Sequence, residues 1–139
     1  MRRSDPVESP VEGHDVGSAV AEFVMVSILV VGLLLAVLQV AVYVHVRNVV
    51  AASAQEGARY GANADVPSAA GTERTLQLVA GALSDETADS LDCAAGEEVG
   101  RGGAVLVMVT CTGAVPSLFT ALGDLLPLAA TGRAVKEGS

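Results

Sequence analysis

The sequence of 139 residues has no tryptophan and only two phenylalanines and two tyrosines. Without aromatic side chains, a protein has no platform on which nucleic-acid bases can stack. Basic residues are scarce as well, because eight lysines and arginines stand against sixteen acidic residues and leave a formal net charge of −8. Nucleic acids and anionic lipids attract clusters of Lys and Arg, and the sequence has no such cluster. We therefore exclude nucleic acid as a partner and expect the exposed part of the chain to bind other proteins.

Groups that carry out catalysis or hold metals are equally few. Ser27 and Ser53 lack a base that would activate a nucleophile, and no glycine-rich loop joins a strand to a helix for phosphate binding. A structural zinc site needs four ligands, whereas the chain offers two cysteines, His14 in the leader and His45. We therefore expect no enzyme activity, no catalytic residue, no cofactor, no metal and no small-molecule substrate.

What the chain does contain is one long apolar run without a formal charge, from Phe23 to Val46. With a helical rise of about 1.5 Å per residue, a run of about 24 residues extends about 36 Å, which exceeds the hydrocarbon core of about 30 Å. The run therefore predicts a transmembrane helix at residues 23–46, in contact with membrane lipid. Gly32 and Ala36 are small residues four apart within it, and such a pair permits another helix to approach closely.

The helix is expected to continue beyond the bilayer. From Arg47 to Ala62 there is no proline and much alanine, and apolar or small residues recur at helical spacing on one side. Polar residues fall largely on the other side; they are Asn48, Gln55, Glu56 and Arg59. We predict one continuous helix over residues 18–62, in which Gly57 and Gly61 let the globular part or a neighbouring subunit pack against the helix backbone.

Residues 63–139 are expected to form a small extracytoplasmic α+β domain with an amphipathic helix and a short antiparallel sheet. The helical spacing of Leu76, Val79, Ala80 and Leu83 predicts the helix. A valine-rich run predicts a central strand with both faces covered, and a solvated loop is expected for the acidic segment before it. The expected elements are a helix at 72–83, an acidic loop at 84–98, a turn at 100–103, a strand at 104–112, a helical turn at 116–122 and a final strand at 128–135, weakened by Gly132.

The two cysteines, Cys93 and Cys111, both follow the anchor. In an exported domain, the oxidising compartment favours a disulfide over free thiols. If the turn at residues 100–103 is centred near Gly102, the two cysteines fall opposite one another on two antiparallel strands. We therefore predict a disulfide that stabilises the domain, by about 3 kcal/mol on chain-entropy grounds.

Glu22, at the head of the apolar helix, is the residue that a simple anchor explains least. An ionised carboxylate left in hydrocarbon costs at least about 2.5 to 3.5 kcal/mol on insertion scales. Cleavage after Gly17 would create a cation, the α-amino group of Ser18, four residues away or on an adjacent copy. Such a pair would stabilise lateral assembly and fix the register between subunits. The alternative is that Glu22 is a polar flank of the span.

Two segments resemble a known family. The run G-S-A-V-A-E-F, from Gly17 to Phe23, resembles the processing site of type IV prepilins. The run A-Q-E-G-A-R-Y-G-A, from Ala54 to Ala62, resembles the segment that follows the membrane helix in TadE-like pseudopilins of the tight-adherence (Flp) pilus system. The resemblance implies a minor pilin or pseudopilin that helps to assemble a pilus used in adhesion.

The same resemblance implies a bacterial single-pass membrane protein. A prepilin peptidase would remove the leader, residues 1–17, on the cytoplasmic side by cutting between Gly17 and Ser18, and Glu22 and Phe23 would serve assembly. The N-terminus would be cytoplasmic and the C-terminal domain extracytoplasmic, either at the cytoplasmic membrane or in a surface pilus. The implied partners are other pilins or pseudopilins and the pilus assembly platform.

Two other functions are compatible with the residues. Ala52-Ser53-Ala54 matches a signal-peptidase site, and cleavage after Ala54 would release a secreted domain that begins at Gln55. Alternatively, the anchor stays uncleaved and the chain is a single-pass extracytoplasmic binding or sensing protein. The three hypotheses predict different N-terminal residues, which are Ser18, Gln55 and Met1.

Overall fold

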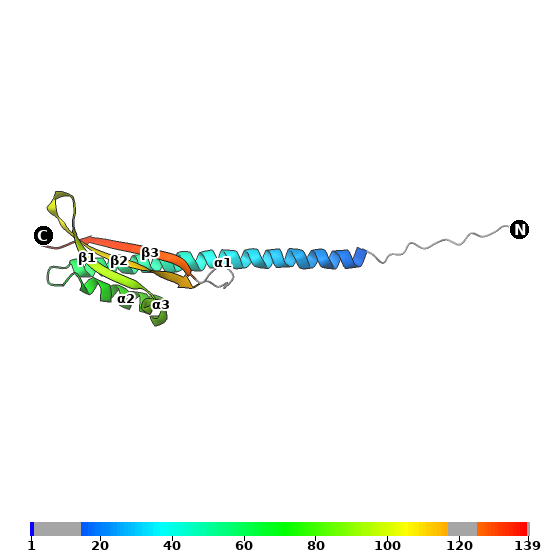
Figure 1. The fold of residues 1–139 in the computed structure, drawn as a ribbon, viewed down its shortest axis with the longest axis horizontal. Helices are drawn as coiled ribbons and strands as arrows, with labels where there is room; N and C mark the ends of the chain where they lie inside the picture. Colours follow the sequence, from blue (N-terminus) through cyan, green and yellow to red (C-terminus); the bar gives the residue numbers. More distant parts are fainter. Residues whose placement is uncertain (2–14, 117–124, 139) are drawn as a thin grey trace. The chain divides into compact units, whose positions relative to one another are not determined.

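The computed structural model describes residue 1, residues 15–116 and residues 125–138 (Figure 1). In chain order, the elements are α1 (Asp15–Ala62), α2 (Ala70–Ala82), α3 (Asp85–Asp89), β1 (Asp92–Val99), the 3-10 turn η1 (Arg101–Gly103), β2 (Val105–Pro116) and β3 (Leu125–Val135). The chain divides into two compact units, Met1–Leu38 and Gln39–Ser139. The fold is α+β, with a long apolar N-terminal helix followed by a small domain of helices and a three-stranded antiparallel sheet, as predicted.

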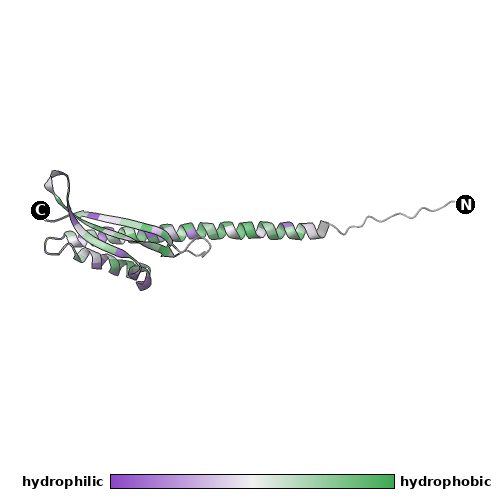
Figure 2. Ribbon diagram, viewed as in Figure 1, coloured by the Kyte–Doolittle hydropathy of each residue, from purple (hydrophilic) through white to green (hydrophobic). Residues whose placement is uncertain are grey.

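In the first unit, α1 carries apolar side chains on all sides, and Figure 2 shows this stretch as predominantly hydrophobic. Exposed fractions are large, for example 73% for Phe23 and 69% for Leu29. A helix that is apolar all round suits lipid rather than one buried face. The Ser27 hydroxyl forms a hydrogen bond within the helix, donating to the Phe23 carbonyl oxygen at 2.8 Å. By length and composition, α1 is a candidate membrane span, and it is the one such helix in the described part of the chain.

The structure describes α1 from Asp15, three residues before the start expected at residue 18, to Ala62. At the C-terminal end, the backbone N–H of Glu137 donates to the Ala62 carbonyl oxygen at 2.8 Å. A residue from beyond β3 therefore caps the C-terminus of α1.

The sheet has the order β1-β2-β3 with antiparallel neighbours, so β2 is the central strand, as its valine-rich sequence predicted. β2 runs to Pro116 rather than Thr112 because its end pairs with the start of β3, which begins at Leu125 rather than at residue 128. Of the helical turn expected at 116–122, Pro116 lies in β2, and the remainder lies outside the described residues.

The acidic segment at residues 84–98 is not a loop, which corrects the expectation from its composition. It forms α3 and β1. Ser84 begins α3 by accepting a hydrogen bond from the Thr87 backbone N–H at 3.1 Å, as serine commonly does at helix N-termini. β1 forms because it pairs along its whole length with β2. As an edge strand it leaves its acidic side chains exposed, so the segment is solvated without being irregular.

The core lies between the helices and one face of the sheet. Val107, Val109 and Cys111 of β2 are fully buried on that face. Leu106 and Met108 on the opposite face are only partly buried, so the prediction that both faces of the strand are covered is wrong. Val109 and Cys111 belong to the buried core cluster, whose other buried residues come from α1, α2, β3, the end of β2 and the α3 region: Val50, Ala54, Ala58, Val79, Ala88, Leu91, Val115, Leu128 and Ala130.

Cys93 and Cys111 form a disulfide, as predicted, with their Cα atoms 4.0 Å apart. They are direct partners in the register of β1 and β2. The turn between the two strands contains Gly102 and Gly103, whose φ angles are 83° and 85°, a conformation that glycine adopts without steric cost. The disulfide therefore fixes the register of the edge strand on the central strand.

Candidate functional site

The predicted processing and assembly residues lie in the first unit, near the start of α1. Gly17, Ser18, Glu22 and Phe23 are all exposed, and a Cβ added at Gly17 would meet no atom within 4 Å. Packing within the described residues therefore does not require glycine here, although glycine weakens a helix by about 1 kcal/mol relative to alanine. Ser18 and Glu22 are four residues apart in one helix, so their side chains share a face. The junction is accessible, and its role in processing stays a prediction.

The small pair in the apolar run also lies in the first unit. Gly32 and Ala36 are exposed, and a Cβ at Gly32 would meet no atom within 4 Å. The glycine contributes to a shallow apolar hollow on the helix surface, which is lined by Ser27, Ile28, Val31, Gly32 and Leu35. The approach of another helix to this surface stays a prediction.

In the second unit, Ala54 to Ala62 of α1 forms the surface on which β3 and α2 rest. Ala54 is fully buried opposite Gly132 of β3. A Cβ on Gly132 would come closer than 3.0 Å to the Ala54 carbonyl oxygen, a distance that real Cβ atoms essentially never show. Glycine in a strand often marks a close approach of another backbone. Gly132, which the sequence pattern treated as a weakness of the strand, is therefore what allows β3 to pass against α1.

Gln55 binds the backbone of β3 at two points. Its Nε2 donates to the Arg133 carbonyl oxygen at 2.6 Å, and its Oε1 accepts from the Arg133 N–H at 3.1 Å. The Gln55 side-chain amide therefore pairs with backbone groups at the free edge of β3, as a neighbouring strand would. Unpaired backbone groups at a sheet edge can otherwise bind another chain. Periodicity put Gln55 on the polar side of the helix and missed this role, because spacing does not separate a solvated amide from one bound to a strand edge. The available signal was its place within A-Q-E-G-A-R-Y.

We expect Gln55→Ala to lower the free energy of unfolding by about 1 to 2 kcal/mol, because two hydrogen bonds are lost. The matched control is Gln77→Ala on α2, since the Gln77 amide donates to the exposed Glu73 side chain at 3.2 Å. The control should change stability by no more than about 0.5 kcal/mol. Equilibrium denaturation of the full chain in detergent measures both variants. Equal unfolding midpoints would contradict the role assigned to Gln55.

Gly57 and Gly61 lie against α2 and the turn before it. A Cβ on Gly57 would lie 2.5 Å from the Gly71 carbonyl oxygen, and one on Gly61 would lie 2.8 Å from the Ser68 carbonyl oxygen. The two glycines therefore bring the globular part close to the backbone of α1, which is one of the two packing options left open by the sequence. Thr75 is fully buried at this contact, and its hydroxyl donates to the Gly71 carbonyl oxygen at 2.8 Å.

Lys136, just beyond β3, joins three parts of the second unit. Its ammonium donates to the carbonyl oxygens of Gly61 at 3.3 Å and Val66 at 3.1 Å, and to the Ser68 hydroxyl at 2.9 Å. The same ammonium lies 3.5 Å from the Glu97 carboxylate of β1, and the Ser68 hydroxyl donates to that carboxylate. Gly61 belongs to the last turn of α1, where the helix dipole favours a cation. Lys136 therefore holds the end of α1, the following turn and β1 together.

This cluster predicts an acid-sensitive contribution to stability. The hydrogen bond from Ser68 lowers the pKa of the Glu97 carboxyl below its ordinary value of 4.5, and the Lys136 ammonium lowers it further. Because the folded-state pKa is the lower one, the stabilisation is present above about pH 4.5 and is lost as the pH falls through the folded-state pKa. We expect the melting temperature to fall as the pH is lowered below about 4.5, and we expect Glu97→Gln to remove the part of this fall that comes from Glu97. Glu98→Gln, at the next position of β1, is the control, and an acid limb unchanged in Glu97→Gln would refute the assignment.

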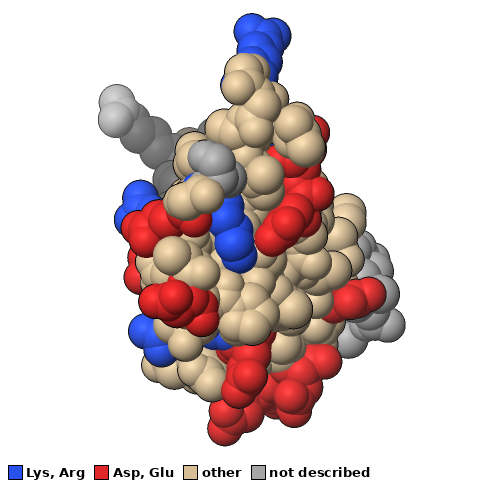
Figure 3. Space-filling model, turned by 90° about the vertical axis from the view of Figure 1, so that its left-hand side faces the viewer, with Lys and Arg blue, Asp and Glu red and all other residues tan. Residues whose placement is uncertain are grey.

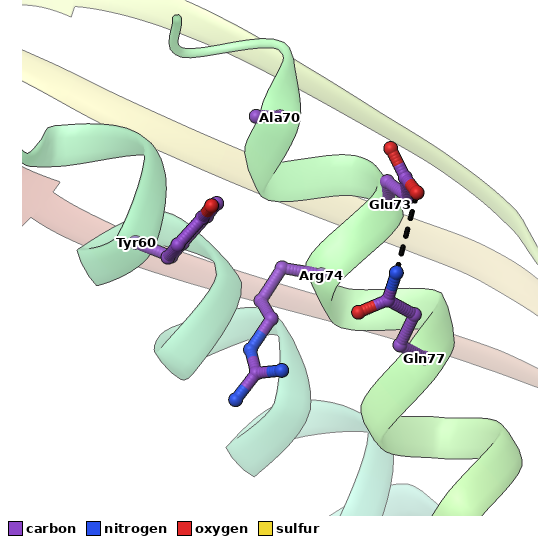
Figure 4. A pocket seen from close by; sticks show the side chains of 5 residues that line it. All are labelled: Tyr60, Ala70, Glu73, Arg74 and Gln77. Carbon is purple, nitrogen blue, oxygen red and sulfur yellow. Dashed lines mark hydrogen bonds between the residues drawn. The ribbon is translucent and has the colours of Figure 1, made fainter. Parts of the chain in front are cut away.

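A shallow hollow on the surface between α1 and α2 is lined by Tyr60, Ala70, Glu73, Arg74 and Gln77 (Figure 4). In the close-up, Glu73 and Gln77 bond to each other, while Arg74 extends on the side of Tyr60. The four polar side chains are exposed. The hollow therefore offers hydrogen-bonding groups to a partner at the surface and does not set a nucleophile beside a base.

The surface of the second unit is predominantly acidic. After Val46 the sequence has eleven acidic and six basic residues, a net charge of about −5, and Figure 3 shows acidic side chains outnumbering basic ones on one face. Within residues 15–116 and 125–138, no three His, Cys, Asp or Glu side chains group together as potential metal ligands. The acidic side chains of α3 and β1 are exposed to solvent.

Comparison with known proteins identifies the family of the N-terminal part. The family model described as "TadE-like protein" matches residues 17–59. No match was found among curated proteins or among solved structures. The matched range begins at Gly17 and extends through Gln55 and Gly57. It therefore contains both the accessible junction and most of the α1 surface on which β3 and α2 rest.

Proposed function

We propose that this chain, whose residues 17–59 match the TadE-like family model, belongs to the tight-adherence pilus system and acts as a minor pilin or pseudopilin in pilus assembly. The observation that carries the proposal is that the family match begins at Gly17, the residue after which processing is expected. The order of parts supports it, because an apolar helix leads into a small α+β unit packed on the second half of the same helix.

In the proposed assembly step, a prepilin peptidase cuts after Gly17 and exposes the α-amino group of Ser18. This cation would lie one helical turn from Glu22 of its own chain and within reach of Glu22 on a neighbouring copy. Among the described residues, Glu22 forms no ion pair or hydrogen bond, so its carboxylate is available for that contact. An ion pair at the edge of the hydrocarbon would offset the cost of the buried carboxylate and set the register between neighbouring helices.

The proposed topology places the N-terminus in the cytoplasm and the second unit outside. The disulfide between Cys93 and Cys111 supports this orientation, because disulfides persist in oxidising compartments. The proposed partners are a prepilin peptidase, other pilins or pseudopilins and the pilus assembly platform. We propose no catalytic role and no cofactor.

The N-terminal residue of the protein isolated from cells tests this proposal. We expect intact-mass analysis of the membrane fraction to give a chain that starts at Ser18, and a strain without prepilin peptidase to give one that starts at Met1. A start at Gln55 in the soluble fraction would replace the proposal with a secreted domain. A start at Met1 in the presence of the peptidase would replace it with an uncleaved binding or sensing protein.

A further inference from the structure

One end of the sheet is a projecting two-stranded ribbon. β1 pairs with β2 only as far as Thr112, whereas β2 and β3 pair with each other as far as Pro116 and Leu125. We call residues 113–116 and 125–128 the ribbon, and all of them are apolar or glycine. At about 3.3 Å per residue, its four residue pairs extend about 13 Å beyond β1.

The ribbon lies beside the last turns of the apolar run in α1. Tyr43 donates its hydroxyl to the Pro127 carbonyl oxygen at 3.1 Å. Tyr43 and Val46 also pack against the core cluster that contains Val115 and Leu128 of the ribbon. Side chains on a helix tilt toward its N-terminus, so the Tyr43 hydroxyl reaches back along the apolar run. The ribbon is therefore level with residues that hydropathy assigns to the membrane.

From the thickness of a bilayer, we expect Tyr43 and the ribbon to lie in the interfacial layer. An anchor that starts at Phe23 needs about 20 residues to cross the hydrocarbon core, which brings it to Val42, and the polar layer adds about 5 to 7 Å on each side. Tyr43 then lies in that layer, where tyrosine is enriched, and its bond to Pro127 brings the ribbon to the same depth. Exposed valines continue the apolar surface on this stretch of α1: Val40, Val42 and Val44, with exposed fractions of 62%, 37% and 46%.

We propose that the ribbon, with Tyr43, is a membrane-docking surface that rests in the headgroup layer of the bilayer from which α1 emerges. The proposal rests on α1 being the membrane anchor, which is part of the proposed function. Leu126 and Pro127 are exposed on the ribbon, and its residues carry no charge. The occupant is therefore zwitterionic lipid held by apolar burial at the interface. Asp92, exposed at the start of β1, lies about 13 Å behind the last described residue pair of the ribbon and would face water.

Tryptophan fluorescence tests the docking, because the chain has no tryptophan of its own. Leu126→Trp places a single reporter on the ribbon. Val99→Trp is the matched control at the other end of the sheet, where the side chain is 73% exposed. Leu33→Trp reports on the anchor itself. The full chain of each variant is reconstituted into phosphatidylcholine vesicles in which part of the lipid is brominated near the headgroup end of its acyl chains or, in a parallel series, deeper.

We expect Leu126→Trp to emit at shorter wavelength than Val99→Trp and to lose emission mainly with the shallow bromines, while Leu33→Trp loses it mainly with the deep ones. Correct folding of each variant is checked by a melting temperature and a disulfide like those of the unaltered chain. If Leu126→Trp fails this check, Pro127→Trp, at the neighbouring exposed position, serves as the reporter. If bromine quenches Leu33→Trp but not the ribbon reporter, the docking proposal is overturned and the membrane anchor is retained. A short-wavelength emission from the ribbon reporter that depends on the protein-to-lipid ratio and is not quenched by bromine would show that the ribbon binds a second copy of the chain. This result would also overturn the docking proposal. An unquenched Leu33→Trp would overturn the anchor and the docking together.

Discussion

Gly132→Ala is expected to detach β3 from α1 and to destabilise the second unit severely. The added Cβ would come closer than 3.0 Å to the carbonyl carbon and oxygen of Ala54 and to the amide nitrogen of Gln55. All three atoms belong to the backbone of a helix, so no change of side-chain rotamer relieves the overlap. The strand must move away, and the two hydrogen bonds between Gln55 and Arg133 then break.

The expected loss is large relative to the stability of a small domain. Overpacking costs about 1 to 3 kcal/mol, and each lost hydrogen bond costs about 1 kcal/mol. Together these give about 3 to 5 kcal/mol, against a total of about 5 to 15 kcal/mol for a typical domain. Denaturant unfolding of the full chain in detergent measures the difference in free energy.

Gly96→Ala is the matched control in the same sheet. A Cβ at Gly96 would meet no atom within 4 Å, and its φ angle is not in the left-handed region. Replacing such a glycine restricts the unfolded chain, so stability should stay unchanged or rise by about 0.4 to 1 kcal/mol. If Gly132→Ala and Gly96→Ala unfold at the same denaturant concentration, the close approach of β3 to α1 is not what requires Gly132.

Gly17→Leu is expected to abolish removal of the leader. A peptidase that cuts beside a membrane helix should not admit a bulky side chain just before the scissile bond. The fold gives no competing explanation, because Gly17 is exposed and a Cβ there would meet no atom within 4 Å. Leucine is also the better helix former, by roughly 1 kcal/mol. We expect the membrane-bound variant to keep its leader completely, as read from its intact mass.

Gly32→Leu provides the comparison for this variant. It introduces the same side chain at another exposed glycine of α1 with open space around it, and it lies well away from the junction. This chain should be processed as the unaltered one is. Recovery of Gly17→Leu protein that begins at Ser18 would show that the peptidase does not read Gly17, and would remove the main support for the proposed processing.

Elements whose formation depends mainly on local composition could be predicted from the sequence. The uncharged run from Phe23 to Val46 predicted an apolar helix because length and composition alone decide that property. The valines of β2 predicted the central strand, and the glycines around Gly102 predicted the turn that sets Cys93 opposite Cys111. Each of these features depends on residues close together in the chain.

Features that depend on distant partners were missed or misread. The acidic composition of β1 favours a loop, and pairing with β2 overrides that preference, as tertiary context does for strand propensity. Sequence spacing predicts a solvated side chain for Gln55 and a weakened strand at Gly132, whereas in the fold Gln55 binds the backbone of β3 and Gly132 lies against the backbone of α1. Periodicity reports which face of an element is buried, but it carries no information about which backbone lies against that face.

The contacts between α1 and β3 also determine when the unit can close during synthesis. The bonds from Tyr43 to Pro127 and from Gln55 to Arg133 join residues 84 and 78 positions apart, so the whole stretch between them must be synthesised before the unit can close. Contacts of such long range form slowly, because a large loop has to be closed before they are gained. Until residue 133 has emerged, the alanine and glycine surface of α1 has no strand against it. A chain released before that point would expose this small, apolar surface of α1 to other proteins.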